Sequence, residues 1–220
     1  MKKYLPTIIR LTFLALFIFL VQNGKPMLWF AVYGISLILS MIFGRIYCGY
    51  VCPMNTVMIP TEWLSKKFNI QTDRTPKWLE SGKFAWIALF GSLAVMLFFR
   101  MKLNKSIPIL LIWLAVSIAI TLRYKPFVFH NLICFLGPPQ KIFGKFARLS
   151  ERVNRDECIG CYKCEKVCPS QAILVRSEDK KAEIKTSLCH QCTNCTQVCP
   201  TDAILYTRDM TRTSSNTNPL

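Results

Sequence analysis

Acidic residues are scarce in this chain. It has 12 Asp and Glu residues against 28 Lys and Arg, which gives a formal net charge of +16 over 220 residues. So basic a charge is also found in nucleic-acid-binding proteins, where it gathers in a patch. Here Lys and Arg are spread over loops and over the flanks of apolar segments, and 52% of the residues are hydrophobic. This combination argues against nucleic acid as a partner and favours a membrane protein with basic flanking segments.

Charge is almost absent from four apolar runs, which are Thr7–Val21, Met27–Phe43, Phe84–Phe99 and Ile107–Leu122. Each is slightly shorter than the roughly 20 residues that span a bilayer. Flanking Lys and Arg side chains such as Arg45 can complete a span by extending to the membrane surface. No small-residue cleavage site follows Val21, so the first run does not resemble a signal peptide. We expect four transmembrane helices in residues 1–122, not four buried helices of a soluble protein.

The distribution of Lys and Arg predicts the orientation. All of them except Lys25, Arg100, Lys102 and Lys105 belong to the N-terminus, the 45–83 loop or the region after the fourth run. By the positive-inside rule, both termini are cytoplasmic and the chain is a multi-pass protein of the inner (plasma) membrane. Structural disulfides are rare in that reducing compartment, so the 11 cysteines do not indicate a disulfide framework, and their spacing must show which of them are metal ligands.

Eight cysteines form two copies of the motif Cys-x2-Cys-x2-Cys-x3-Cys-Pro, which end at Pro169 and Pro200. Bacterial two-cluster ferredoxins have this spacing, and in them the Cys before Pro binds the other cluster. We therefore expect one [4Fe–4S] cluster on the first cysteine set, Cys158, Cys161, Cys164 and Cys199. The second cysteine set, Cys189, Cys192, Cys195 and Cys168, is expected to bind the other. Cys-x2-Cys pairs also bind zinc, but zinc ribbons do not need two copies with matched flanks.

The predicted ferredoxin domain covers residues 151–208 and is of the α+β class. Short apolar runs predict strands at Ala172–Val175 and Ala203–Tyr206, with a third at Glu183–Lys185. His190, beside Cys189, either tunes a cluster by hydrogen bonding or is a solvated loop residue. Residues 123–150 form a basic juxtamembrane segment, and residues 209–220 a disordered tail.

The membrane part carries a cysteine motif of its own. Cys48-Gly49-x2-Cys52-Pro53 follows the second apolar run, and His130-x3-Cys134 follows the fourth. The alignment of the two motifs predicts two tandem repeats, each of two helices and a ligand motif, around an axis along the membrane normal. Cys48, Cys52, His130 and Cys134 have three interpretations: a site for a third cluster or a metal, a redox-active pair of Cys48 and Cys52, or buried structural side chains.

Four spans with Cys-Gly-x2-Cys-Pro after the second, followed by a two-cluster tail, resemble the NapH-like family. These are membrane ferredoxin-type quinol dehydrogenase components, related to NosR-type proteins. The resemblance covers about residues 5–208. Family members usually carry a second Cys-x3-Cys-Pro, whereas here His130 stands for the first Cys and Phe135 for the Pro. The resemblance implies electron flow between the quinone pool and the clusters, with delivery to a partner redox protein.

No nucleophile pattern marks the chain as a stand-alone enzyme. We expect an electron-transfer subunit of a membrane oxidoreductase complex, whose basic face favours an acidic partner and anionic lipids. Two other functions stay open. The clusters could reduce a metal for cofactor assembly or sense redox state for regulation, or they could only stabilise a structural anchor.

Overall fold

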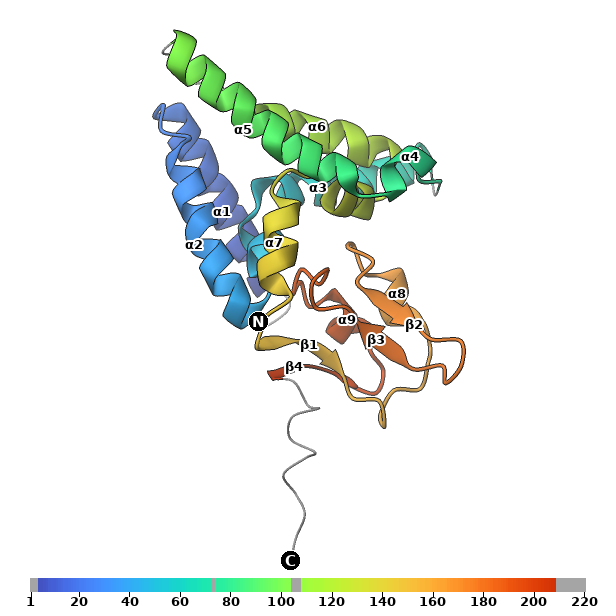
Figure 1. Cartoon of the computed structure of the whole chain (residues 1–220). Helices are drawn as coiled ribbons and strands as arrows, with labels where there is room; N and C mark the ends of the chain where they lie inside the picture. The colour runs from blue at the N-terminus through green and yellow to red at the C-terminus, as the bar shows by residue number, and fades with distance from the viewer. Residues whose placement is uncertain (1–3, 73, 104–107, 209–220) are drawn as a thin grey trace, which may run out of the picture. The chain divides into compact units, whose positions relative to one another are not determined.

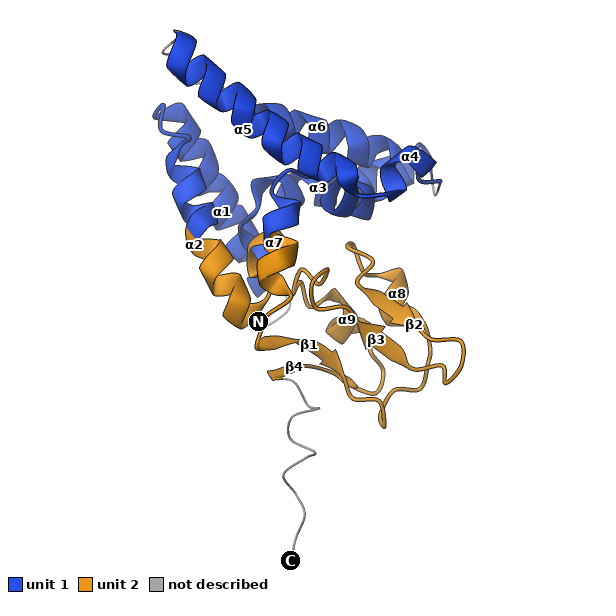
Figure 2. Ribbon diagram, viewed as in Figure 1, with its two compact units in different colours: residues 1–34, 50–139 blue, residues 35–49, 140–220 orange. Residues whose placement is uncertain are grey.

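The computed structural model describes residues 4–72, 74–103 and 108–208. The chain divides into two compact units (Figures 1 and 2). Unit 1 holds residues 1–34 and 50–139, and unit 2 holds residues 35–49 and 140–220. The segment 35–49 is therefore grouped with the C-terminal residues, and the boundary before it falls within the helix formed by residues 28–43. The predicted tail, 209–220, lies outside the described residues.

All four apolar runs form helices: α1 (Leu5–Gln22), α2 (Leu28–Phe43), α5 (Lys83–Leu103) and α6 (Ile109–Arg123). Two are long and apolar enough to cross a membrane, α1 with a mean hydropathy of 2.0 and Lys83–Lys102 of α5 with 1.9. The other two are shorter apolar helices. The predicted helical, apolar N-terminal region is confirmed, whereas four complete spans stay a prediction.

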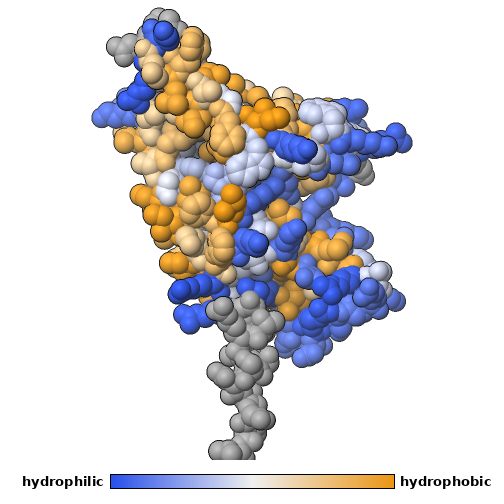
Figure 3. Space-filling model, in the orientation of Figure 1, coloured by the Kyte–Doolittle hydropathy of each residue, from blue (hydrophilic) through white to orange (hydrophobic). Residues whose placement is uncertain are grey.

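Both long helices expose apolar side chains. Ile8 on α1 is 58% exposed, and Ile87 and Phe90 on α5 are 66% and 62% exposed. Figure 3 shows hydrophobic residues spread over the surface of the helical part, with hydrophilic residues prevailing on the C-terminal part. Exposed apolar side chains in such number need lipid or another apolar surface against them. It supports association with a membrane.

Helix α3 (Pro53–Lys67) lies at the centre of unit 1, packed against α6 and α1. The hydroxyl of Ser65, which is fully buried, donates to the Leu122 carbonyl at 2.6 Å. Beyond α3, Thr72 forms a parallel bridge with Tyr124, and the short helix α4 (Lys77–Glu80) leads into α5. Helices α5 and α6 are joined by the Trp113 indole, which donates to the Ser92 hydroxyl at 3.0 Å.

Each pair of apolar helices is followed by a π-helical turn. These turns are η1 (Tyr47–Val51) and η2 (Val128–Ile133). The cysteines that follow them have nearly the same backbone angles, φ −67° and ψ 118° at Cys52 and φ −58° and ψ 120° at Cys134. Helix α3 follows Cys52, and α7 (Gly137–Gly144) follows Cys134. Single π turns are rare and often accompany functional sites, and both lie where the sequence aligns the two motifs.

Unit 2 contains two antiparallel two-stranded sheets. Strand β1 (Leu149–Val153) pairs with β4 (Ile204–Arg208), and β2 (Ile173–Val175) pairs with β3 (Ala182–Ile184). The three predicted strands are confirmed, with bounds shifted by one or two residues. Strand β1 is not predicted by the sequence, because Leu-Ser-Glu-Arg-Val contains no apolar run and gains its pairing only from β4.

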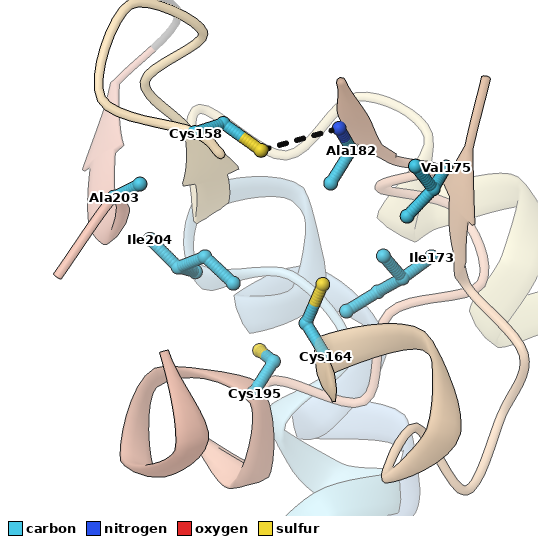
Figure 4. Close-up of a cluster of buried hydrophobic side chains, with 8 residues drawn as sticks. All are labelled: Cys158, Cys164, Ile173, Val175, Ala182, Cys195, Ala203 and Ile204. Carbon is cyan, nitrogen blue, oxygen red and sulfur yellow. Dashed lines mark hydrogen bonds between the residues drawn. The ribbon is translucent and has the colours of Figure 1, made fainter. Parts of the chain in front are cut away.

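Short helices α8 (Lys163–Lys166) and α9 (Asn194–Val198) complete unit 2. Its hydrophobic core mixes aliphatic side chains with thiols (Figure 4). In Figure 4, Cys164 and Cys195 extend from the two short helices toward the side chains of Ile173 and Ile204, between strands from both sheets. A core this small buries little apolar area, so a bound group among the thiols would add substantially to its stability.

Candidate iron–sulfur centres

The two cysteine motifs force the backbone into the same unusual turns. Tyr162 and Thr193, which precede α8 and α9, have φ of 61° and 60°. Gln171 and Asp202, which follow the Cys-Pro pairs, have φ of 48° and 51°. Residues other than glycine rarely adopt such left-handed angles, and each costs free energy. Four matched exceptions show that both copies fold the same way, as loops whose side chains converge instead of continuing a helix.

The first cysteine set lines one cavity. The space is about 360 Å³ when open solvent at its mouth is included, and its walls include Cys158, Cys161, Cys164 and Cys199 together with Val153, Val175 and Ile204. Three of these cysteines come from the first motif, and Cys199 comes from the second. The chain thus brings together, around one space, the four thiols that the ferredoxin spacing groups across the two motifs.

The second cysteine set converges in a more buried environment. Burial raises the pKa of the Cys189 thiol to about 12; the backbone N–H of Gln191 opposes this, and the charges of Cys192 and Cys168 add to it. Burial also raises the pKa of Cys195, and the charges of Cys189, Cys192 and Cys168 act in the same direction. Like charges have such an effect only at short range. Cys168, from the first motif, is therefore close enough to the second motif for its charge to act on Cys189 and Cys195.

Backbone N–H groups point at the sulfurs. Ala182 N donates to Cys158 Sγ at 3.5 Å, and Ala172 N donates to Cys168 Sγ at 3.3 Å. Burial alone would raise the pKa of Cys199, but hydrogen bonds from Thr201 and from the backbone of Ala203 lower it below its usual value. N–H groups aimed at sulfur stabilise the thiolate, which is the form that binds iron.

These features fit a pair of cubane clusters. Each set offers four cysteines, one for each iron, in surroundings that are partly apolar and donate hydrogen bonds to sulfur. Among the described residues, no group of three or more His, Cys, Asp or Glu side chains is placed to hold a single metal ion. The ferredoxin cysteines do not form such a group either. The four thiolates of a cubane bind four different irons, so they are spaced around the cluster and do not converge on one ion.

The segment before η1 packs onto the loop of the second cysteine set. Arg45 Nη1 donates to the Ser187 carbonyl at 3.3 Å, and Nη2 lies 3.4 Å from Cys48 Sγ. The Arg45 side chain is fully buried. The expectation that Arg45 extends to a membrane surface is therefore wrong, because its guanidinium turns inward and binds a carbonyl and a thiol of its own unit.

Two glycines allow this close approach. A Cβ at Gly49 would lie 2.2 Å from the His190 carbonyl oxygen, and a Cβ at Gly44 would lie 2.5 Å from the Gln191 amide nitrogen. His190 itself is 1% exposed, so the interpretation of it as a solvated loop residue is wrong. The Gly44–Gly49 segment, which we call the η1 turn segment, forms one wall of the second site.

Buried polar side chains lie around the second cysteine set. Gln191 Oε1 accepts from Glu151 N at 2.9 Å, and Gln191 Nε2 donates to Ser150 Oγ at 2.8 Å. Glu151 is 2% exposed, and burial raises its pKa. Sequence reasoning missed Arg45, Gln191 and Glu151 as site residues. The sequence offered a signal for Arg45 alone: in the Gly44-Arg45 pair, a charged residue follows an apolar helix almost directly.

Three of the four membrane-motif residues lie within unit 1. Cys52 and Cys134 follow the two π turns and are both 5% exposed. His130, 3% exposed, has its Nε2 3.0 Å from Asn55 Oδ1. Cys48 belongs to unit 2, where it contacts Arg45. The fourfold site stays a prediction, and any ligand role of His130 would use Nδ1 while Nε2 is held by Asn55.

The chain matches two family models. A model described as a 4Fe-4S dicluster domain matches residues 151–206, which include all eight ferredoxin cysteines. A model described as a 4Fe-4S binding domain matches residues 26–71, which include Cys48 and Cys52. Both halves of the chain thus match iron–sulfur families, and the [4Fe–4S] clusters expected from the spacing are supported independently.

Three curated relatives carry ferredoxin-type names. The methylamine utilization ferredoxin-type protein MauN of Paracoccus denitrificans is 31% identical over 159 residues, covering 64% of this chain and 54% of MauN. MauN of Methylobacillus flagellatus is 30% identical, with 65% and 54% covered. The ferredoxin-type protein NapH of Haemophilus influenzae is 27% identical, with 64% and 53% covered. The chain spans about half the length of these relatives. Together with the two matched models, these likenesses support a NapH-like 4Fe–4S ferredoxin-type protein.

Proposed function

We propose that the protein is a membrane-bound electron-transfer subunit with two [4Fe–4S] clusters. Through these clusters it passes electrons between the quinone pool, or a membrane redox partner, and a partner on the cytoplasmic side. The observation that carries the proposal is the cavity lined by Cys158, Cys161, Cys164 and Cys199. It gathers the thiols of two motifs around one space, as cross-ligated clusters require. The first cysteine set would hold one cluster and the second set the other.

Each bound cluster supplies one-electron redox chemistry, so a two-electron donor such as a quinol must release its electrons one at a time. The chain's own residues provide ligands, spacing and dielectric. The first site opens to solvent through Cys161, which is exposed, and is bordered by Ile159, 65% exposed. It is therefore the side on which a soluble partner could approach within electron-transfer distance. The second site is enclosed by the η1 turn segment.

Membrane attachment and orientation belong to the same proposal. The exposed apolar faces of α1 and α5 and the excess of Lys and Arg on one side of the apolar runs support an inner-membrane location with cytoplasmic clusters. Cysteine accessibility in intact and permeabilised cells tests it: Cys introduced at Ser177, in an exposed loop of unit 2, should react with an impermeant maleimide only after permeabilisation. Equal labelling of intact cells would contradict a cytoplasmic ferredoxin domain.

The decisive measurement is iron and acid-labile sulfide per chain on anaerobically purified protein. Two cubanes require about 8 irons, and a third cluster would bring about 12. About 8 would support the two ferredoxin clusters and contradict a third cluster at Cys48, Cys52, His130 and Cys134. A value near 12 would assign that set a cluster. A value well below 8, with zinc in its place, would contradict the proposal.

A quinol assay separates electron transfer from the alternatives. If the proposal holds, a menaquinol analogue reduces the clusters of the wild-type protein, seen as bleaching of their visible absorption and the appearance of an electron paramagnetic resonance (EPR) signal. Clusters inert to quinols, together with copper binding at Cys48 and Cys52, would instead indicate metal reduction for cofactor assembly. Potentials beyond the reach of any cellular donor would leave the clusters a structural role.

A further inference from the structure

The proposed function by itself does not explain why the positive charge of Arg45 is buried. Its side chain is 0% exposed and ends in a cationic guanidinium. Burying an isolated charge costs several kcal/mol unless an opposite charge compensates it. Within the described part of the chain, no carboxylate lies at ion-pair distance from Arg45, and its Nε has no hydrogen-bond partner. The compensating negative charge must come from another group.

The contacts of Arg45 identify where that group lies. Nη1 binds the carbonyl of Ser187, two residues before Cys189, and Nη2 faces the sulfur of Cys48. On the same segment, the position of a Cβ on Gly49 would be 3.7 Å from Cys192 Cα and 2.2 Å from the His190 carbonyl. The guanidinium is thus seated against the loop that supplies Cys189 and Cys192. A [4Fe–4S] cluster with four thiolates is an anion, because its thiolates outweigh the charge of its core.

The segment is built to keep Arg45 in place. A Cβ on Gly144, in α7, would lie 2.8 Å from Arg45 Cγ, so only glycine leaves room for the side chain there. Arg148 N donates to the Met41 carbonyl at 3.2 Å, and Tyr206 OH donates to the Phe43 carbonyl at 2.9 Å. These bonds hold the end of α2 against the residue before β1 and against β4 within unit 2. Because the side chain is packed on several sides, its charge has little freedom to move away.

We propose that Arg45 is a positioning residue for the second cluster: it holds the η1 turn segment on the Ser187–Cys192 loop, and its buried charge raises that cluster's reduction potential. The inference rests on the proposed function only in requiring that the second cysteine set holds a cluster. Reduction adds one negative charge, and a nearby buried cation stabilises the reduced form. The second cluster should therefore accept electrons more readily than its buried surroundings alone would allow.

The first site offers a matched comparison. Lys181 Nζ donates to the Cys158 carbonyl at 2.5 Å, so a cation also contacts the loop of the first cysteine set. Lys181 is only partly buried, whereas Arg45 is fully buried. A charge that water can screen has less influence on a neighbouring group than one in a low-dielectric interior. Removal of Lys181 should affect the first cluster in the same direction as removal of Arg45 affects the second, but less.

The test uses the full chain, purified anaerobically in detergent, in wild-type form and as Arg45→Gln, Arg45→Lys and Lys181→Met. Gln keeps amide donors for Ser187 and Cys48 without the charge, and Lys keeps the charge without the two-armed geometry. Iron and sulfide are counted first, and the two reduction steps are then followed by EPR during a potentiometric titration. A wild-type chain with fewer than about 8 irons would contradict the proposed function itself, separately from the role of Arg45.

With both clusters present, we expect Arg45→Gln to move one reduction step to a more negative potential. Arg45→Lys should leave that step close to its wild-type position. Lys181→Met should move the other step, by less. Loss of about half the iron in Arg45→Gln but not in Arg45→Lys would also support the proposal, because the charge would then be needed to retain the cluster. Unchanged potentials in Arg45→Gln would overturn it. So would equal shifts, or equal iron loss, in the Gln and Lys variants, which would assign the effect to side-chain shape.

Discussion

The first and second cysteine sets occupy equivalent positions in two copies of one motif, with matched left-handed turns, yet their surroundings differ. Around the first set are aliphatic side chains and an exposed Cys161. Around the second are buried Arg45, Glu151 and Gln191, and the η1 turn segment covers it. Two copies of one ligand motif thus receive one open, apolar site and one enclosed, polar site. Because burial, charge and hydrogen bonding set cluster potentials, the two clusters should not be equivalent electron carriers.

One pair of positions shows how the difference arises. Gly160, φ 67°, follows the first cysteine of the first motif by two residues, and Gln191, φ 56°, is its counterpart in the second. A Cβ at Gly160 would lie 2.2 Å from the Lys180 carbonyl, so glycine is required there. Gln191 accepts the cost of a left-handed backbone and uses its side chain to bind Ser150 and Glu151. At the first site this turn passes close to another backbone segment, whereas at the second site its side chain forms hydrogen bonds with neighbouring residues.

The largest effect is expected from testing which cysteines share a cluster. The double variant Cys161→Ala/Cys199→Ala removes two ligands of the first set, whereas Cys161→Ala/Cys168→Ala removes one from each set. The first double variant should contain about 4 irons per chain instead of about 8, because one cluster is lost. The second double variant should lose nearly all of its iron, because both clusters lose a ligand. Iron and sulfide analysis of anaerobic preparations measures this. The reverse order would contradict cross-ligation and show that each motif holds its own cluster.

A smaller effect is expected where the η1 turn segment touches the second site. Gly49→Ala places a methyl group 2.2 Å from the His190 carbonyl oxygen. Backbone must shift to relieve it, at a cost of about 1–3 kcal/mol in the free energy of unfolding. In thermal unfolding followed by visible absorption, Gly49→Ala should lose part of the cluster absorption at a lower temperature than the wild-type protein does. Gly91→Ala in α5, where a Cβ meets nothing within 4 Å, is the matched control. Equal behaviour of the two variants would mean that the segment does not cover the second site.

The buried carboxyl beside the second set predicts a dependence on pH. Burial raises the pKa of Glu151, so its ionisation destabilises the folded state. This cost is absent below the ordinary carboxyl pKa of about 4.3. It grows as the pH rises from there to the raised folded-state pKa, and is constant above it. Glu151→Gln should therefore stabilise the protein at neutral and mildly alkaline pH, with the gain shrinking toward acid.

Thermal unfolding at a series of pH values measures the Glu151→Gln effect. Glu183→Gln is the control, since Glu183 lies on β3 near the first site and its side chain is 54% exposed. A gain that is the same at every pH would show that side-chain packing, and not the charge of Glu151, is responsible.

The smallest effect is expected for an exposed ion pair near the first site. Arg176, directly after β2, pairs with Glu183 on β3, and their side chains are 45% and 54% exposed. Surface pairs of this kind contribute about 0–1 kcal/mol to stability, because water and salt screen them. Arg176→Met should leave iron content and both potentials unchanged in the titrations used for Arg45. A potential shift as large as that of Arg45→Gln would contradict the role of burial in the comparison.

Spacing along the chain was enough to predict the cluster ligands. The eight cysteines follow a local pattern in which each side chain's place depends on its nearest neighbours. The cavity that joins Cys199 to the first motif agrees with this grouping. The apolar runs predicted helices, and short apolar stretches predicted β2, β3 and β4, because period and composition act locally. The bounds of α2 and α6 agree with those of their runs to within two residues, and whether these two shorter helices cross a membrane stays a prediction.

Contacts between segments far apart in the sequence could not be predicted in this way. Nothing near Arg45 signals that its guanidinium binds Ser187, 142 residues later, and nothing near Asn55 signals its contact with His130. Strand β1 exists only through β4. Thus the sequence by itself was enough to predict [4Fe–4S] clusters and the thiols expected to bind them, because ligand spacing is a local property. Only the tertiary structure decided that one site is open and the other lies beneath a buried cation, because burial and electrostatic environment depend on which distant segments pack around it.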